Sequence, residues 1–186
     1  MNLKNLLEGN SILLVPGIYD GLSALIAEQA GAKIVYLSGA SLAYTRFGLP
    51  DIGLVSMTEV SETISIIRDR IKVPLIVDAD NGFGNALNVQ RTVRVFERMG
   101  ANALQIEDQA IPKRCGHLDN KKLISSVEMI GKIKAACDAR LSEETLIIAR
   151  TDAIAVEGFE SALRRSEDYI RAGADLLFVE APKSQH

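Results

Sequence analysis

The segment Met99-Gly100-Ala101-Asn102-Ala103-Leu104-Gln105-Ile106-Glu107-Asp108 contains the unit that is repeated along this chain. A glycine ends the amphipathic segment before it, a mostly apolar run follows, and two acidic residues come where that run ends. Glycine is common just after a helix because it adopts left-handed backbone angles without a steric penalty. A short, nearly continuous apolar run is typical of a strand buried on both faces. The segment therefore predicts a helix end, a tight turn and a buried strand that carries carboxylates to its carboxyl end.

The same joint recurs at Ala30-Gly31-Ala32 and at Ala172-Gly173-Ala174. Short apolar runs alternate with amphipathic segments along the whole chain, which is typical of repeated β/α units. We expect strands at residues 12–15, 33–37, 75–79, 103–107, 146–149 and 175–179. We expect helices at residues 23–29, 58–70, 88–99, 126–139 and 161–172.

These repeated joints favour an α/β fold of the (β/α)8 TIM-barrel type over two domains, although a doubly wound sheet uses the same local pattern. A closed barrel needs eight units and usually about 250 residues. The chain has 186 residues and six predicted strands, so it is a truncated barrel, an open sheet, or a barrel completed by another chain. Truncation after the sixth strand is the prediction, because the unpaired edge left there is one that stable proteins normally cover. Residues 1–186 are thus interpreted as one incomplete barrel domain.

The composition is that of a soluble globular protein, with 47% hydrophobic and 24% charged residues. A net charge of -3 without any run of Lys or Arg argues against nucleic acid or a membrane surface as partner and favours a small molecule. No apolar segment is long enough to span a bilayer, and the first residues lack a signal-peptide core. With only two cysteines, Cys115 and Cys137, the chain is predicted to be cytoplasmic with reduced thiols.

Acidic residues follow two successive predicted strands, at the edge where parallel α/β proteins place their chemistry. Asp78 and Asp80 are two residues apart on one predicted strand, so their side chains are expected on the same side, and Glu107 ends the next strand. Three converging carboxylates repel one another unless a cation joins them. A hard ion that prefers oxygen ligands fits best, which predicts Mg²⁺ with Mn²⁺ as an alternative. The competing interpretation is that such acids, Asp80 and Asp108 especially, cap the helices that follow.

The segment Lys113-Arg114-Cys115-Gly116-His117 follows the strand that carries Glu107. Its cations favour the thiolate over the thiol, which predicts Cys115 to be a reactive acid or base. The segment has no helical or strand period and contains a glycine, so a mobile flap over the cation site is expected. A loop that is charged by chance would leave the thiol without a role.

Zinc is a rival interpretation of the Cys115-x-His117 pair. A structural zinc ion needs four ligands, usually Cys or His. Cys137 lies in a predicted helix and His186 is the last residue, so two further suitable ligands are lacking.

The chain resembles the isocitrate lyase and phosphoenolpyruvate mutase superfamily. The matching stretches are Pro16-Gly17-Ile18-Tyr19-Asp20, Tyr36-Leu37-Ser38-Gly39, Gly48-Leu49-Pro50-Asp51-Ile52-Gly53, Asp78-Ala79-Asp80-Asn81-Gly82-Phe83-Gly84, Ile106-Glu107-Asp108-Gln109, Lys113-Arg114-Cys115-Gly116-His117, Ala149-Arg150-Thr151-Asp152 and Val179-Glu180-Ala181. The resemblance implies a (β/α)8 barrel that uses Mg²⁺, acts on small di- or tricarboxylates, and assembles as a homo-oligomer, typically a tetramer.

The resemblance also implies residue roles. The clamp on the substrate's α-oxo-carboxylate consists of Ser38, Gly39 and Ala40. The ion and its waters are held by Asp78, Asp80 and Glu107, with Glu180 in the same network. Substrate oxygens are contacted by Arg150 and Glu180. The catalytic group consists of Cys115, Arg150, Tyr36, Asp51, Lys113 and His117.

The cysteine loop resembles that of the carbon–carbon lyase branch, which includes methylisocitrate lyase and 2,3-dimethylmalate lyase. There, Tyr36 or a nearby carboxylate would remove the substrate's hydroxyl proton, and the C–C bond would break in a retro-aldol sense to release pyruvate. Arg150 and the cationic loop would stabilise the enolate of the second fragment, and Cys115 would protonate its carbon.

Three alternatives stay open. Leu118 follows His117 where methylisocitrate lyases more often have Arg-Pro, and a Leu there is also seen in carboxyvinyl-carboxyphosphonate phosphorylmutase (carboxyphosphoenolpyruvate mutase). Oxaloacetate decarboxylases belong to the same superfamily but generally lack the cysteine loop. The third alternative is a non-catalytic, truncated fragment that retains the ion and carboxylate pocket.

Overall fold

In a computed structural model that describes residues 2–9, 11–118 and 120–182, the chain forms five consecutive β/α units of a TIM-type barrel and a sixth strand. All neighbouring strands are parallel and follow the order β1 to β6 across one sheet. The strands are β1 (Gly17–Ile18), β2 (Val35–Leu37), β3 (Leu75–Asp78), β4 (Ala103–Glu107), β5 (Leu146–Thr151) and β6 (Leu176–Val179). The helices are α1 (Leu3–Leu7), α2 (Gly21–Gln29), α3 (Gly39–Leu42), the π-helical turn η1 (Ala43–Phe47), α4 (Met57–Arg68), α5 (Ala86–Arg98), α6 (Ser126–Ala139), α7 (Ala153–Glu157) and α8 (Phe159–Arg171).

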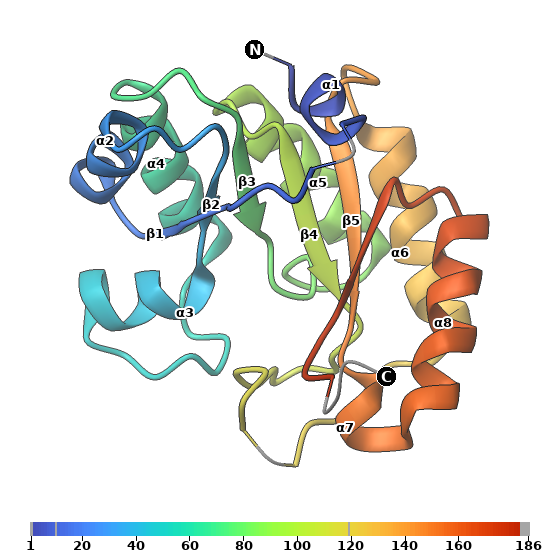
Figure 1. Ribbon diagram of the computed structural model, residues 1–186. Helices are drawn as coiled ribbons and strands as arrows, with labels where there is room; N and C mark the ends of the chain where they lie inside the picture. The colour runs from blue at the N-terminus through green and yellow to red at the C-terminus, as the bar shows by residue number, and fades with distance from the viewer. Residues whose placement is uncertain (1, 10, 119, 183–186) are drawn as a thin grey trace.

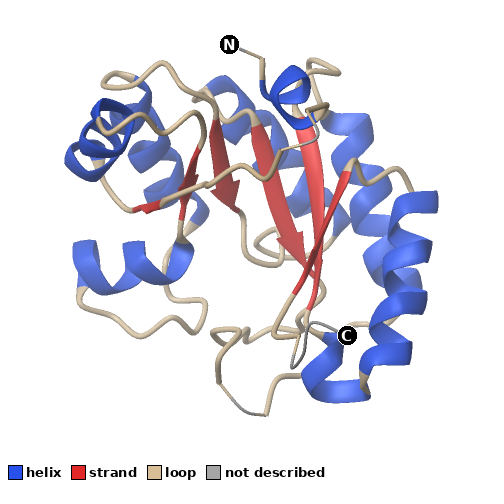
Figure 2. Ribbon diagram, in the orientation of Figure 1, coloured by secondary structure: helices blue, strands red, loops and turns tan. Residues whose placement is uncertain are grey.

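The larger hydrophobic core lies between the sheet and the helices on its outer face (Figure 1). Strand residues such as Val77 and Leu104 meet Val93 and Phe96 of α5 there, and all four are fully buried. Helix and strand alternate along the chain, and Figure 2 shows the strands as a central layer with helices around one face. None of the helices in the described part of the chain combines the length and the apolar character that crossing a bilayer requires.

A second, smaller core covers the inner face of the sheet at its amino end. Leu3 of α1 packs there against Ile34, Ile76 and Leu146, which precede or begin strands. The N-terminal helix therefore closes the end of the sheet opposite to the strand carboxyl ends (Figure 1).

The first predicted strand is wrong. Residues 12–15 form no strand, and β1 comes later and is short. In this apolar run Leu13 and Val15 pack on the inner core, whereas Ile12 and Leu14 are 100% and 86% exposed. Every second side chain of this apolar run is buried, as in a strand. The backbone pairing with β2, however, begins only at Pro16, whose carbonyl accepts from the Tyr36 amide.

The other predicted strands and helices are confirmed within one or two residues at most ends. Their boundaries follow from capping: Ser56 accepts from the Glu59 amide while Glu59 accepts from the Ser56 amide, which starts α4 with a reciprocal capping box. Four short elements were not predicted, namely α1, α3, η1 and α7. Each has four or five residues, too few to show a period in the sequence.

Replacing Gly100 by Ala is expected to lower the free energy of unfolding by about 1–3 kcal/mol, because φ here is +103°, a region that is strained for other residues. An added methyl group would also lie 2.4 Å from Cγ of Arg68, whose guanidinium donates to the carbonyls of Ile71 and Val73. Urea unfolding of the purified variant measures the effect.

The matched control is Gly131→Ala, in the exposed face of α6. Nothing lies within 4 Å of the added methyl group, and the helix should gain about 0.5–1 kcal/mol. Equal effects of the two substitutions would contradict the proposed role of Gly100 as the joint between α5 and β4.

Candidate active site

A cavity of about 460 Å³ opens at the carboxyl ends of the strands. In Figure 1 this is the lower end, where α3, α7 and the loop before α6 gather. Among the predicted site residues, those that line it are Tyr36, Ser38, Ala40, Asp51, Asp78, Glu107, Lys113, Cys115, His117, Arg150 and Glu180. The remaining two, Gly39 and Asp80, line a smaller hollow that shares Asp51 and Asp78 with it. The structure thus brings the predicted residues together, while their roles stay predictions.

Asp78 and Asp80 converge, but not for the predicted reason. β3 ends at Asp78, and Asp80 has φ +47°, so the alternation of a strand does not reach it. The turn of the backbone brings the two carboxylates together at Gly39. A methyl group on Gly39 would lie 3.0 Å from Oδ2 of Asp78 and 3.5 Å from Oδ1 of Asp80.

Glu107 ends β4 inside the sheet and is 2% exposed. Its Oε1 has no hydrogen-bond partner among the described residues. Burial, together with the charges of Asp80 and Asp78, raises the pKa of Glu107 well above its usual range, although Arg150 opposes this. Burial and the nearby Asp78 also raise the pKa of Asp80, to about 7. Burial and mutual repulsion therefore disfavour the ionised forms of these two carboxylates unless a cation joins them.

Lys113 enters this acidic cluster from the loop after β4. Its Nζ contacts Oδ1 of Asp51 and lies 2.6 Å from Oδ1 of Asp80, and the lysine is 5% exposed. Burial lowers its pKa, but the charges of Asp80, Asp78 and Glu107 raise it further, so the pKa lies above the usual range. The ammonium group pairs with these carboxylates, and the influence of Lys113 on its sequence neighbour Cys115 stays a prediction.

The chemistry of this donor set fits a hydrated divalent ion. In the described part of the chain, six buried or half-buried carboxylates surround the cavity and its walls, and the buried cations that pair with them are Lys113, Lys121 and Arg150. The six are Asp51, Asp78, Asp80, Glu107, Asp152 and Glu180. Among the residues described, no three His, Cys, Asp or Glu side chains are close enough to hold an ion directly. Mg²⁺ usually keeps several of its waters and takes few protein ligands, so Asp78, Asp80 and Glu107 can hold it in part through water.

The interpretation of Asp80 and Asp108 as helix caps is wrong. The following helices are capped by Asn85 and Ser125, whose side chains accept from the amides of Asn88 and Glu128.

Asp108 instead organises the protein behind the cavity. It accepts from the Thr151 hydroxyl at 2.7 Å, the Asp152 amide at 3.0 Å and the Tyr169 hydroxyl at 2.8 Å. It also lies 3.4 Å from a guanidinium nitrogen of Arg165. This carboxylate therefore ties the end of β5 to α8.

Arg150, on β5, is held from three sides. Its Nε and Nη2 donate to the two oxygens of Asp152 at 3.0 and 3.1 Å, a bidentate pair. Glu107 lies 3.5 Å and Glu180 3.3 Å from the guanidinium. The Phe178 ring stands 5.8 Å away from Cζ. The guanidinium is thereby fixed in the cavity wall with an exposed fraction of 8%.

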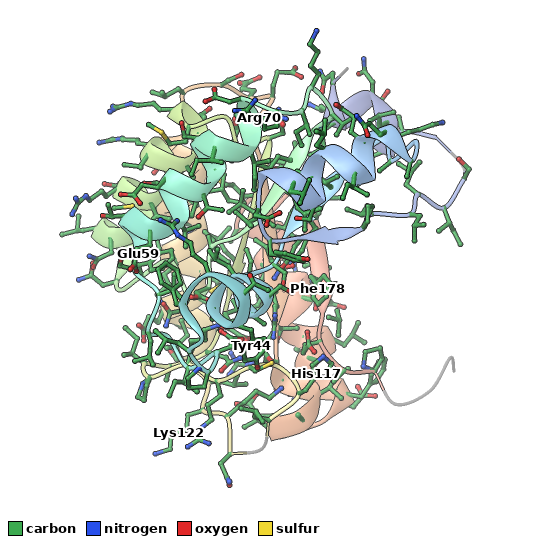
Figure 3. All side chains as sticks on the ribbon, turned by 90° about the vertical axis from the view of Figure 1, so that its left-hand side faces the viewer. Tyr44, Glu59, Arg70, His117, Lys122 and Phe178 are labelled. Atoms are coloured by element: carbon green, nitrogen blue, oxygen red, sulfur yellow. The ribbon has the colours of Figure 1, made fainter. Side chains whose placement is uncertain are left out.

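The cysteine loop covers the cavity and is tied down. The Cys115 amide donates to the Asp51 carbonyl at 3.0 Å, and Gln109 pairs with the backbone of Arg114 through two 2.9 Å hydrogen bonds. Figure 3 shows His117 on this loop at the end of the molecule beyond Phe178. The loop residues thus line the cavity, while the predicted flap over the cation site and its mobility stay predictions.

The predicted carboxylate clamp has a second structural role. The Ser38 side chain caps α3 by accepting from the Ser41 amide at 3.2 Å, and the Gly39 amide donates to Oδ2 of Asp78 at 3.2 Å. Ser38 and Ala40 still line the cavity. The amide of Gly39 is thus turned towards the acidic pair.

Tyr36, at the middle of β2, is half-buried and lines the cavity. Burial and then the charge of Asp78 raise the pKa of its phenol well above the usual value. At neutral pH the group is therefore a hydrogen-bond donor.

The sequence model of the phosphoenolpyruvate phosphomutase family matches residues 3–186 of the chain. The chain belongs to this family. Among its relatives, a 2-methylisocitrate lyase of Aeropyrum pernix is 50% identical over 179 residues, which are 96% of this chain and 57% of that protein. A 2,3-dimethylmalate lyase of Eubacterium barkeri is 42% identical over 183 residues, which are 98% of this chain and 63% of that protein. The chain thus spans about three fifths of the length of these relatives.

Solved structures agree with this membership. An oxaloacetate acetylhydrolase in complex with 3,3-difluorooxalacetate superposes with a TM-score of 0.95 at 37% identity, over 98% of this chain and 63% of that one. A 2,3-dimethylmalate lyase of the PEP mutase/isocitrate lyase superfamily gives 0.93 at 36% identity, over 98% and 62%. A phosphonopyruvate hydrolase in complex with oxalate and Mg²⁺ gives 0.85 at 36% identity, over 92% and 59%. The predicted membership of the isocitrate lyase and phosphoenolpyruvate mutase superfamily is confirmed.

Three residues at this site were not predicted from the sequence. Lys121 and Asp152 form a buried ion pair beside Arg150, at 2.9 Å. Gln105 lines the cavity with both amide atoms unpartnered among the described residues. The position of Gln105 could have been predicted, because a polar residue two places before Glu107 on a buried strand faces the same side as Glu107. The role of Lys121 could not have been predicted, since its partner Asp152 is 31 residues away in the sequence.

Proposed function

We propose that this chain is the catalytic part of a Mg²⁺-dependent carbon–carbon lyase. The substrate would be an acid of the 2-methylisocitrate or 2,3-dimethylmalate type, cleaved to pyruvate and a second carboxylate. The observation that carries the proposal is a single cavity that unites an excess of buried carboxylates with Arg150 and with the loop of Cys115. Relatives named for these two activities, at 50% and 42% identity, support it.

The cleavage begins with removal of the hydroxyl proton of the substrate. Tyr36 and a nearby carboxylate are both in reach of the cavity, and the raised pKa of Tyr36 favours the carboxylate as the base. The carbonyl forms as the adjacent C–C bond breaks, and the electron pair stays on the carbon next to the second carboxylate.

Arg150 and Cys115 complete the reaction. The fixed guanidinium of Arg150 stabilises the negative charge that develops on the departing fragment, at no cost of reorganisation. The Cys115 thiol then donates its proton to the carbanionic carbon. His117 and Arg114, in the same loop, line the cavity and add positive charge or hydrogen-bond donors there.

A divalent ion, when bound, supplies charge that stabilises the oxygens of the forming keto acid. Ser38, Ala40 and Asp51 line the cavity together with Asp78, and we assign the substrate's α-oxo-carboxylate to this part of the lining. Glu180 completes the same wall through its contact with Arg150.

Removal of divalent ions with EDTA should lower pyruvate release by at least about 100-fold, because the ion's contribution is worth several kcal/mol. Adding Mg²⁺, or Mn²⁺, should restore it. The experiment uses the whole protein, with circular dichroism before and after chelation as the control for folding. Full turnover after exhaustive chelation would contradict the assignment of a metal.

Pyruvate release, coupled to lactate dehydrogenase, tests the activity itself. The screen compares methylisocitrate, 2,3-dimethylmalate and oxaloacetate, with Mg²⁺ present. Release of pyruvate from one of the first two supports the proposal. Absence of both pyruvate and oxalate release from all three, with Mg²⁺ and oxalate still bound in a calorimeter, would show a binding function in its place.

A second candidate is hydrolysis of oxaloacetate, in which water is consumed and oxalate and acetate are formed. It is favoured by the TM-score of 0.95 to the oxaloacetate acetylhydrolase. Oxalate in place of pyruvate as the product separates it from the lyase reaction. Assembly as a homotetramer and a cytoplasmic location remain predictions of the resemblance and the composition.

A further inference from the structure

We propose that Lys121 is a positioning residue that fastens the cysteine loop to Asp152 and so fixes the Cys115 thiol over the cavity. This inference deepens the proposed function and rests on the role that it gives to Cys115. The contacts that carry it are two hydrogen bonds from one buried ammonium group.

Lys121 Nζ donates to the Gly116 carbonyl at 2.6 Å and to Oδ1 of Asp152 at 2.9 Å. The side chains of the lysine and the aspartate are 2% and 0% exposed. A buried ammonium group is costly unless it is paired and hydrogen-bonded, so this side chain has a strong preference for the one place that offers both partners. The carbonyl that it holds belongs to the residue directly after Cys115.

Asp152 is shared between the loop and the arginine. Its Oδ1 accepts from Lys121 and also from Nη2 of Arg150, at 3.1 Å, and its Oδ2 accepts from Nε. The two cations lower the pKa of Asp152 despite its burial, so the carboxylate stays ionised. One carboxylate therefore sets the spacing between the guanidinium and the loop backbone.

Gly116 packs closely against Arg150. A methyl group there would lie 2.5 Å from Nη2 of Arg150 and 2.7 Å from Oε1 of Glu180. The loop backbone at Gly116 thus packs directly against Arg150 and Glu180, which line the cavity. Its carbonyl accepts from Lys121.

The rest of the loop has independent anchors. Lys113 holds the start of the loop through its carboxylate partners, and the Cys115 amide is held by the Asp51 carbonyl. Asp152 is in turn fixed by its amide, which donates to Asp108. Loss of the Lys121 contacts should therefore free the part after Cys115 while the metal site and the fold stay intact.

The test replaces Lys121 by Met in the whole protein, which keeps the apolar stem but removes the ammonium group. The first readout is the rate at which iodoacetamide alkylates Cys115, followed by mass spectrometry. We expect a rise of about fivefold or more, because a thiol on a freed loop is more accessible. Cys137 of α6, whose Sγ contacts the Gly173 carbonyl, is the internal reference and should react at the wild-type rate.

The second readout is turnover. Misplacement of a catalytic group by about 1 Å can cost about 100-fold, so kcat should fall by about that factor while KM changes by less than about threefold. The matched control is Lys122→Met: this neighbouring lysine is exposed at the lower edge of the molecule in Figure 3 and does not line the cavity, so it should change neither readout.

The outcomes separate the two proposals. Faster alkylation of Cys115 alone, in Lys121→Met and not in Lys122→Met, supports the positioning role even if the wild-type protein cleaves none of the tested acids, in which case only the proposed function fails. An unchanged or slower alkylation of Cys115 overturns the positioning role. An equal rise at Cys115 and Cys137 also overturns it, because it shows general loosening of the fold.

Discussion

Replacing Cys115 by Ser is expected to lower kcat/KM for carbon–carbon cleavage by about 10²–10⁴-fold, the usual contribution of a general acid. A serine hydroxyl is a far weaker acid than a thiol, so proton delivery to the departing carbon becomes slow. The loop should keep its place, because its anchors are the backbone of Cys115 and Gly116 and the side chains of Lys113 and Lys121. The measurement is coupled pyruvate release from the whole protein, at saturating Mg²⁺.

Cys137→Ser is the matched control for this variant. Cys137 is the second thiol of the chain, half-buried in α6, where it packs against the larger core and its Sγ donates to the Gly173 carbonyl, and it does not line the cavity. Its replacement should leave kcat/KM within about twofold of wild type, as for substitutions away from a reacting centre. Mg²⁺ binding in a calorimeter should be the same in all three proteins. Cleavage at the wild-type rate by Cys115→Ser would remove Cys115 from the mechanism.

Replacing Arg150 by Gln is expected to have two large effects. Loss of a preorganised donor to a developing negative charge should lower kcat by about 10²–10³-fold. The free energy of unfolding should fall by about 3–5 kcal/mol, because the carboxylates of Glu107, Asp152 and Glu180 lose their shared cation inside the protein. Coupled pyruvate release gives the first value and urea unfolding the second.

Arg171→Gln controls for the removal of an arginine as such. Arg171 ends α8 with 70% of its side chain exposed, and pairs there with Glu167 and Asp168. Solvent screens such pairs, so the unfolding free energy should change by less than about 1 kcal/mol and kcat by nothing measurable. A stability loss as small for Arg150 as for Arg171 would contradict the view that the cavity carboxylates depend on Arg150.

The β/α units could be predicted because the signals are local. Buried parallel strands are apolar runs, and the joints at Gly31, Gly100 and Gly173 all have positive φ. The run at residues 12–15 misled because every second residue packs on the inner core without pairing. Burial alternates there as in a strand, and hydropathy cannot tell the two apart.

The candidate site was predictable where strand order decides it. Glu107 ends β4, Arg150 is the last residue but one of the neighbouring β5, and the two are paired directly in the register, so their convergence follows from topology. Asp80 converges with Asp78 through a turn with positive φ, and the alternation of side chains along a strand does not predict such a turn. The partners of Lys113 could not be predicted either, since the sequence places the lysine next to Cys115 and the fold turns it to Asp51 and Asp80.

Anomalous diffraction from crystals of the whole protein, grown with Mn²⁺ in place of Mg²⁺ and with oxalate, tests the central claim most directly. The account predicts one strong manganese peak between Asp78, Asp80 and Glu107, with oxalate beside it on the side of Ser38 and Arg150. A peak at another place, or none at these carboxylates while oxalate is bound, would contradict it.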